Sequence, residues 1–183
     1  GMPCLYYGDE LGMGDWPGLR DRDPNRTPMA WTPARNGGFS SAPDPLLVLP
    51  PITAPGYDYR VVNVEVQKQL PGSLLNWHRR MLTCRRLLPA LRHGSFQLLT
   101  CSHPGALAYV RATDAMTVLV AANVTAAGAS FSLDLSRWDG KRTREVMWGC
   151  DFPPASQEWF VNLPPYGINW WLIGEVETAS TPA

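Results

Sequence analysis

The sequence predicts a fold of two parts, an α/β segment followed by an all-β antiparallel sandwich. The first observation is a short apolar run, Pro3–Tyr7, which lies between two glycines and is typical of a buried strand. The second is a stripe of apolar residues at helical spacing within residues 61–88. The third is a series of short segments separated by turn signals within residues 95–174, which is the pattern of β-sandwiches.

Length and composition limit the classes of protein to which the chain can belong. Its 183 residues suffice for a small domain and part of another, and 45% of them are hydrophobic, which allows a packed core. The chain has 16 basic and 16 acidic residues, so it offers no excess positive charge to neutralise nucleic-acid phosphates. No apolar stretch approaches the roughly 18–20 residues that cross a bilayer, so neither nucleic acid nor a membrane is an expected partner.

The first part begins directly on its apolar run, without Met at position 1 and without the features of a signal peptide. We therefore expect the chain to be cut from something larger. A long stretch dense in Pro, Gly, Asp, Asn and Arg follows the apolar run. Because long loops are uncommon in compact domains unless they are functional, Asp15–Ser41 is a candidate site loop.

Residues 61–88 are expected to be mainly helical. Ser73 follows a Pro-Gly pair and is the expected N-cap, and Pro89 is expected to end the helix. An apolar stripe with spacings of three and four residues indicates one face packed on a larger body. The stripe consists of Leu74, Trp77, Met81, Cys84 and Leu88.

The second part shows the alternation of β-strands. Phe131, Leu133 and Leu135 alternate with polar residues, so one face of this strand should be buried and the other exposed to solvent. The other expected strands are Phe96–Thr100, Ala106–Ala112, Met116–Asn123, Arg144–Trp148, Glu158–Leu163 and Ile168–Ile173.

The chain has four cysteines that are far apart in the sequence. They are Cys4, Cys84, Cys101 and Cys150. None forms a C-x-x-C pair, so neither a metal site nor a disulfide framework is expected. We interpret them as buried thiols of a cytoplasmic protein.

Two linked motifs surround the candidate site loop. One is G-M-P-C-L-Y-Y-G-D-E at Gly1–Glu10. The other is D-R-D-P-N-R-T-P-M-A-W at Asp21–Trp31, followed by R-N-G-G-F-S at Arg35–Ser40. Together they resemble the last barrel strand and the following loop of the α-amylase family of glycoside hydrolases.

Later segments are similar to the trehalose synthases within that family. These are V-N-V-E-V-Q at Val62–Gln67, S-L-L-N-W at Ser73–Trp77 and the ending L-P-P-Y-G-I-N-W-W at Leu163–Trp171. The short spacing between Glu10 and Arg26 favours the same group, because the oligosaccharide-cleaving relatives usually carry a longer insertion there.

The resemblance implies a (β/α)₈ TIM barrel followed by an antiparallel C-terminal β-sandwich. Residues 1–93 would be the end of the barrel (last strand, loop and helix), residues 94–175 the sandwich and residues 176–183 a flexible tail. The implied activity is a retaining interconversion of maltose and trehalose by intramolecular transglucosylation. No cofactor is expected, and no metal site is expected within this chain. Since the active sites of such barrels lie on loops at the C-terminal ends of the strands, the loop after Tyr7 belongs to the functional face.

The family's catalytic carboxylates come from earlier barrel strands, so no catalytic residue is expected in this chain. Asp9, Glu10, Asp21 and Asp23 are not expected to replace them, and structural roles that bind backbone amides are favoured for Asp9 and Glu10. The chain alone is therefore expected to be inactive, and the remainder of the barrel upstream is its expected partner.

Four residues are candidates for substrate binding. The resemblance implies that Arg26 lines the closed end of the glucose pocket, where its guanidinium fork can donate to two neighbouring oxygens. Asp23 either orients Arg26, reaches the acceptor glucose or braces the loop. Arg22 and Trp31 are weaker candidates, for which bracing or anchoring the loop is the alternative. Ala30 stands where the family usually has Gln, which could alter the packing under the sugar pocket.

Two other functions stay open. One is an α-glucosidase or oligosaccharide hydrolase of the same family, which would release glucose to water. The other is a stand-alone, non-catalytic carbohydrate-binding or structural β-sandwich, although an isolated barrel strand and helix would expose an unpaired edge and an apolar face. The expected ligands are maltose, trehalose or other α-glucosides, and a homo-oligomer is not excluded.

Overall fold

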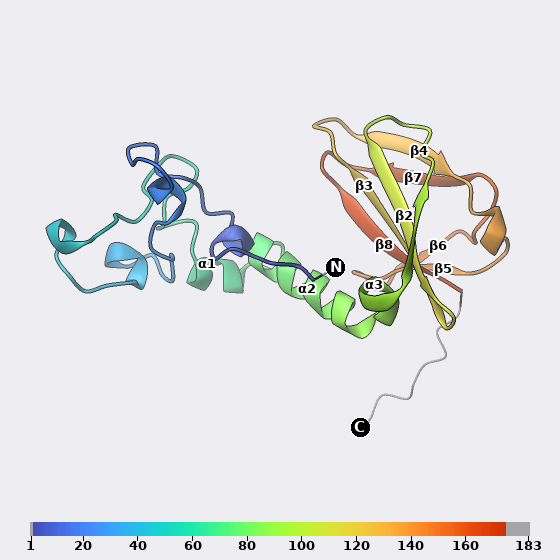
Figure 1. Ribbon diagram of the computed structural model, residues 1–183, viewed down its shortest axis with the longest axis horizontal. Coiled ribbons are helices and arrows are strands. Elements are labelled where there is room, and N and C mark those ends of the chain that lie inside the picture. The colour runs from blue at the N-terminus through green and yellow to red at the C-terminus, as the bar shows by residue number, and fades with distance from the viewer. Residues whose placement is uncertain (1, 175–183) are drawn as a thin grey trace, which may run out of the picture. The chain divides into compact units, whose positions relative to one another are not determined.

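The computed structural model describes residues 2–174 (Figure 1). The chain divides into two compact units, Gly1–Leu82 and Thr83–Ala183. The tail expected at residues 176–183 lies outside the described residues. Among the helices that the structure describes, none has the length and apolar character needed to span a membrane.

The first unit consists mainly of loops that are interrupted by short helical turns. Four 3₁₀ turns cover Asp9–Leu11, Asp23–Asn25, Arg35–Gly38 and Asp44–Leu46. Gly8 has a φ of 95°, a left-handed conformation that favours glycine, and it turns the chain directly after Tyr7. The many Pro, Gly and Asn residues of this stretch therefore produce fixed turns rather than helices or strands.

The expectation of a buried strand at Pro3–Tyr7 is wrong for this chain. The segment belongs to no sheet among the described residues, and Leu5, Tyr6 and Tyr7 are exposed. A barrel strand obtains its hydrogen bonds and its burial from the strands on either side. No described strand lies beside this segment.

Two helices follow the loop: α1 at Val64–Gln69 and α2 at Leu74–Leu87. Ser73 is the N-cap of α2, because its hydroxyl accepts a hydrogen bond from the Asn76 amide at 3.2 Å. Only Leu75 of this helix is buried, whereas Leu74 of the expected stripe is exposed. Trp77, Met81 and Cys84 of the stripe are half-buried and Leu88 is buried, so the stripe is covered more fully toward the end of the helix.

Pro89 has a second role besides ending the helix. The residue before it, Leu88, has an extended conformation, which is what the proline ring imposes on its neighbour. Pro89 itself occupies the first turn of a further short helix, α3 at Pro89–His93, where its missing N–H costs nothing.

Asn63 fixes the start of α1, and replacing it should destabilise the first unit. Its side chain is fully buried, accepts from the Val66 amide at 2.9 Å and donates to the Tyr59 carbonyl at 2.8 Å. Asn63→Ala removes an N-cap and leaves a carbonyl unpaired, so the free energy of unfolding should fall by about 2 kcal/mol. The measurement is urea unfolding of the complete enzyme. Asn63→Ser keeps a capping oxygen and should cost less; equal losses for the two variants would refute the capping role.

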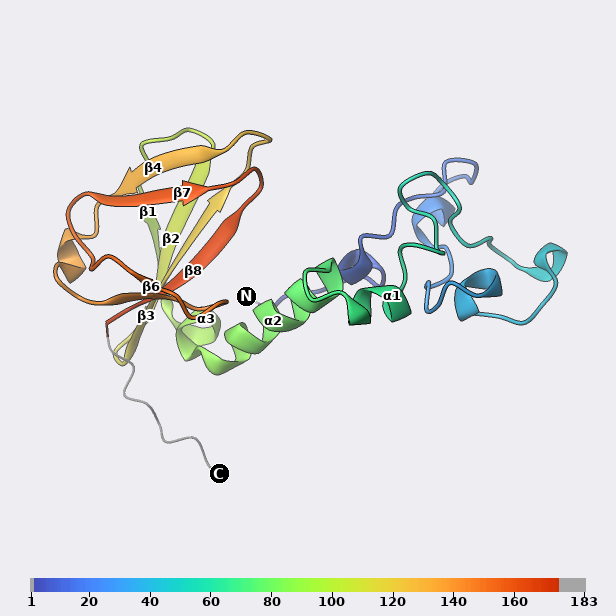
Figure 2. The ribbon, with the colours of Figure 1, turned by 180° about the vertical axis from the view of Figure 1, so that it is seen from behind.

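The second unit is an antiparallel β-sandwich. Its larger sheet has six strands in the order β1-β2-β3-β8-β5-β6, and its smaller sheet pairs β4 with β7. Figures 1 and 2 show β4 and β7 crossing one face of the larger sheet. The strands are β1 Ser95–Leu99, β2 Ala106–Thr113, β3 Met116–Asn123, β4 Ala129–Leu133, β5 Thr143–Glu145, β6 Asp151–Phe152, β7 Trp159–Leu163 and β8 Ile168–Ile173.

The core lies between the two sheets and is centred on aromatic side chains. The rings of Trp159 and Trp171 meet edge to face at 5.1 Å, and Phe152 contacts Trp171 in the same way at 5.5 Å. Phe131 and Leu133 of β4 are buried on this side, as their alternation with serines predicts. The opposite face of the large sheet is partly covered by α3, which packs on β2 and β3.

The expectation of buried thiols is wrong. All four cysteines are free, Cys4 and Cys150 are exposed, and Cys84 and Cys101 are half-buried. Cys4 is exposed because it belongs to the uncovered segment before Gly8. Cys150 lies in the turn between β5 and β6.

Candidate functional site

The loop after Tyr7 encloses a cavity of about 690 Å³ within the first unit. Three polar side chains line it: the phenol of Tyr7, the carboxylate of Glu10 and the guanidinium of Arg26. The rest of the wall is largely apolar. It is formed by Pro28, Met29, Trp31, Phe39, Ser40, Ala42, Leu46, Leu47, Val48 and Leu49. A mostly apolar cavity with a few converging polar groups is the usual form of a small-molecule site.

Tyr7 connects the Pro3–Tyr7 segment to the candidate site loop. Its hydroxyl donates a hydrogen bond to the carbonyl of Thr27 at 3.0 Å. Burial raises the pKa of Tyr7 above its ordinary value, and the neighbouring Tyr6 raises it further, whereas the positive charge of Arg26 lowers it. The net shift is upward, so the phenol stays protonated near neutral pH and remains a donor.

Arg26 directly follows the 3₁₀ turn Asp23–Asn25 and lines the cavity. Its nearest charged partner is Asp23, with 3.9 Å between the guanidinium nitrogen and the carboxylate oxygen, and both side chains are about half exposed, at 50% and 49%. An ion pair of this length and exposure is strongly screened by water. The guanidinium donors are therefore accessible to a ligand in the cavity.

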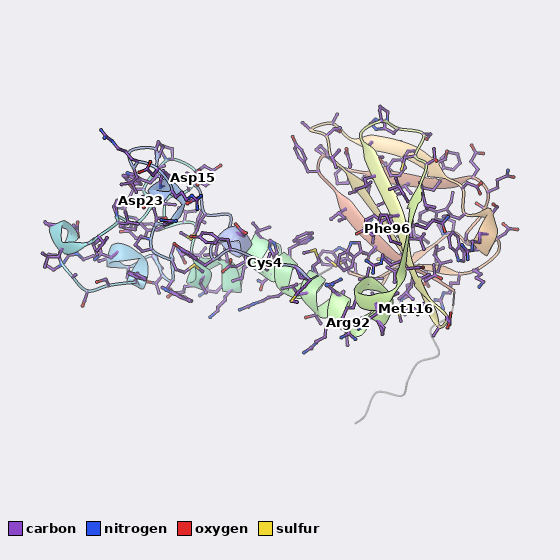
Figure 3. All side chains as sticks on the ribbon, viewed as in Figure 1. Cys4, Asp15, Asp23, Arg92, Phe96 and Met116 are labelled. Atoms are coloured by element: carbon purple, nitrogen blue, oxygen red, sulfur yellow. The ribbon has the colours of Figure 1, made fainter. Side chains whose placement is uncertain are left out.

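Asp23 and Arg22 do not line the cavity. Figure 3 places Asp23 on the loop region of the first unit. Asp23 contacts Arg26 through the 3.9 Å ion pair, and Arg22 is exposed at the residue before the turn. Trp31 does line the cavity and is half exposed, and its backbone carbonyl accepts from the Glu65 amide at 3.0 Å. Its ring is thus presented to the cavity while its backbone is anchored on α1.

Asp9 and Glu10 bind backbone amides, as the sequence suggested. The Asp9 carboxylate accepts from the Tyr6 amide at 3.0 Å, and the Glu10 carboxylate accepts from the Gly8 amide at 2.9 Å. Both therefore stabilise the turn that redirects the chain after Tyr7. Glu10 also contributes to the cavity wall, so its carboxylate serves the turn and the site together.

Sequence reasoning missed three features of the site. Tyr7 belongs to the expected strand and to the first motif, but the sequence does not predict that its side chain lines the site. The apolar run Leu46–Leu49 was not assigned to any element, although four consecutive aliphatic residues in a Pro-rich loop are unusual. Asn36 belongs to the second motif, but the sequence analysis gives it no role of its own. Its side chain is buried, and its φ is 54°, a left-handed conformation that asparagine tolerates better than most residues. That signal, an asparagine before two glycines, was present in the sequence.

Comparison with protein-family models identifies the class of protein. The model of the alpha amylase catalytic domain matches residues 1–94, and that of the maltogenic amylase C-terminal domain matches residues 96–170. The first match covers more than half of the chain. The chain therefore belongs to the α-amylase family, and it combines the end of a catalytic barrel with a C-terminal β domain.

The curated relatives with high identity are trehalose synthases. The chain is 44% identical over its whole length to trehalose synthase/amylase of Mycobacterium tuberculosis and covers 31% of that protein. It is 40% identical to trehalose synthase of Pimelobacter, of which it covers 33%, and 39% identical to that of Thermus thermophilus, of which it covers 18%. The chain thus spans about a third or less of the length of these relatives.

Solved structures of the same family share the fold. Trehalulose synthase of Pseudomonas mesoacidophila superposes with a TM-score of 0.74 at 26% identity, over 94% of this chain and 36% of that one. Trehalose-6-phosphate hydrolase of Bacillus licheniformis superposes with a TM-score of 0.74 at 21% identity, over 96% and 36% of the two chains. The loop-rich first unit, with its exposed Pro3–Tyr7 segment, thus resembles the corresponding part of much longer proteins.

Proposed function

We propose that this chain is the C-terminal part of a retaining α-glucosyl enzyme that interconverts maltose and trehalose by intramolecular transglucosylation. The observation that carries the proposal is the cavity on the loop after Tyr7, which Arg26, Trp31 and Phe39 all line. Sugars present hydroxyls at their rim and C–H groups on their faces, so a forked donor beside aromatic rings suits a glucose unit. The identity to trehalose synthases along the whole chain supports this choice of reaction.

In the proposed reaction the two catalytic carboxyl groups come from the barrel outside this chain. One carboxylate attacks C1 of the non-reducing glucose of maltose while the other group protonates the departing O4, so the C1–O4 bond breaks and a glucosyl-enzyme forms. The released glucose turns within the site and attacks C1 with its anomeric hydroxyl, whose proton passes to the second carboxyl group. The bond between C1 and the first carboxylate breaks in this step, so both carboxyl groups return to their starting states. The two displacements retain the α configuration and give the α,α-1,1 linkage without consuming water.

The residues of this chain would bind, orient and shield the sugar. Arg26 would donate to the hydroxyls of the glucose that is transferred, and Asp23 would hold the guanidinium in place. Trp31 would cover an apolar face of a sugar ring. The aliphatic wall would keep water away from the glucosyl-enzyme, since water competes with the held glucose for C1.

Product analysis of the complete enzyme tests the proposed reaction. The enzyme is incubated with maltose labelled in both rings and with an excess of unlabelled free glucose. Trehalose labelled in both rings is the expected main product, because the released glucose does not leave the site. Labelled glucose without trehalose would show that the enzyme is a hydrolase of the same family. Trehalose with one unlabelled ring would show that the acceptor comes from solution.

The boundary between the two domains is part of the same proposal. We propose that residues 1–93 complete the barrel and that residues 94–175 form the separate C-terminal domain. The complete enzyme is proposed to work in the cytoplasm, where thiols stay reduced. The absence of a disulfide among the cysteines of the described residues supports this location. A stand-alone binding module is not favoured, since apolar side chains are exposed in the Pro3–Tyr7 segment and on α2, where they are Leu74, Leu82 and Leu87.

A further inference from the structure

One wall of the cavity is an aliphatic run that the loop exposes to solvent. The run is Leu46–Leu49, and all four residues line the cavity. Leu46 is 72% exposed and Val48 is 97% exposed, whereas Leu47 and Leu49 are half-buried. Exposed aliphatic side chains that line a cavity mark a surface with a function.

The loop that carries this run is held at its base by Asn36. The side chain of Asn36 is buried, and its amide nitrogen donates to the carbonyls of Ser40 at 3.0 Å and Ala42 at 2.8 Å. The hydroxyl of Ser40 in turn accepts from the Ala42 amide at 3.1 Å. The chain between Ser40 and Ala42 is therefore fixed against the turn that contains Asn36.

An ion pair fixes the next point along the loop. The guanidinium of Arg35 donates from Nε and Nη2 to one carboxylate oxygen of Asp44, at 3.2 and 2.8 Å. Asp44 begins the 3₁₀ turn that leads into the aliphatic run, and its carbonyl accepts from the Leu47 amide at 3.1 Å. The start of the run is thus tied to the residue directly before Asn36. Arg35, Asn36 and Asp44 together are called the loop clamp below.

We propose that the loop clamp positions the Leu46–Leu49 wall over the sugar cavity and thereby determines how often the glucosyl group passes to the held glucose rather than to water. This inference rests on the proposed function. None of the three clamp residues lines the cavity, so each acts through the wall as a positioning residue. A wall that moves away admits water to C1 while Arg26 still binds the sugar. Loss of the clamp should therefore raise the share of glucose among the products while the affinity for maltose stays nearly the same.

The test removes the ion pair in the complete enzyme without touching the cavity. Asp44→Asn and Arg35→Gln should each raise the ratio of glucose to trehalose formed from maltose by roughly two- to five-fold, the range set by the coupling of an exposed ion pair. KM for maltose should stay close to the wild-type value. The doubly reversed variant, Arg35→Asp with Asp44→Arg, should restore much of the original ratio.

The chain offers a matched control for these variants. Arg142 and Asp151 are also nine residues apart, also 2.8 Å apart and also exposed, but they lie in the sandwich. Asp151→Asn should leave the product ratio unchanged. An unchanged ratio in Asp44→Asn, or an equal change in Asp151→Asn, would overturn the role of the clamp.

A second measurement separates the clamp from the proposed reaction. Limited chymotrypsin digestion should cleave the Leu46–Leu49 run several-fold faster in Asp44→Asn than in the wild type, and no faster in Asp151→Asn. If the wild-type enzyme makes no trehalose, the proposed reaction fails, and the rate of cleavage still decides whether the ion pair holds the loop. Equal cleavage rates in wild type and Asp44→Asn would overturn the clamp whatever the products are.

Discussion

Replacing Arg26 by Ala in the complete enzyme should lower kcat/KM for maltose by roughly 10²- to 10⁴-fold. The cavity gives the guanidinium room to donate two hydrogen bonds to sugar oxygens, and a hydrogen bond with one charged partner contributes about 1.5–3 kcal/mol. Stability should be preserved, because the side chain is half exposed and its ion pair with Asp23 is 3.9 Å long. Steady-state kinetics with maltose and a melting curve measure the two effects.

Two further variants make this prediction specific. Arg26→Lys keeps the charge but loses the planar fork, so its activity should lie between those of wild type and Arg26→Ala. Arg60→Ala removes another exposed arginine of the first unit, which pairs with Asp58 and does not line the cavity. It should leave the kinetics nearly unchanged. Near-normal turnover of Arg26→Ala would exclude Arg26 from the site.

Replacing Trp159 by Ala should destabilise the sandwich by about 3–5 kcal/mol, the usual cost of truncating a buried large aromatic. Trp159 is 2% exposed, packs edge to face on Trp171 and donates from its indole N–H to the Pro153 carbonyl at 3.0 Å. The variant would leave a cavity between the two sheets, whereas the Pro153 carbonyl would keep its hydrogen bond from the Thr143 hydroxyl at 2.7 Å. Urea unfolding followed by near-ultraviolet circular dichroism measures the loss.

The neighbouring residue provides the control. Phe160 lies in the same strand, points to the other side and is 70% exposed, so Phe160→Ala should cost less than about 1 kcal/mol. Trp159→Phe keeps a ring but loses the indole donor, and its cost should fall between the two. Equal destabilisation by Trp159→Ala and Phe160→Ala would mean that the aromatic cluster does not hold the sheets together.

The sandwich was predictable because its strands carry local signals. Met116–Asn123 and Ile168–Ile173 have the expected bounds, since each combines β-branched or aromatic residues with flanking turns. β6 was missed because Asp151–Phe152 is too short to show any alternation. Pairing across the sheet, in which β8 lies between β3 and β5, is a long-range property that no local pattern contains.

The first unit was less predictable because its order depends on contacts distant in the sequence. The apolar character of Pro3–Tyr7 indicates a strand that needs neighbouring strands to bury it, but the described residues supply no strand beside it. The motif resemblance singled out Arg26 and Trp31, and the structure brings both to one cavity. The motifs could not predict the Leu46–Leu49 wall or the loop clamp. The clamp depends on side-chain hydrogen bonds from Arg35 and Asn36 to residues that lie beyond the motif.

The most direct test of the sugar pocket is a crystal structure of the complete enzyme with glucose or an unreactive maltose analogue bound. The guanidinium of Arg26 should then donate to hydroxyls of the non-reducing glucose at about 2.7–3.1 Å, with Trp31 against a sugar face. The Leu46–Leu49 wall should lie beside the bound sugar and shield its C1 from solvent. A sugar bound elsewhere in the barrel, with Arg26 turned away from it, would contradict the assignment of this loop to substrate binding.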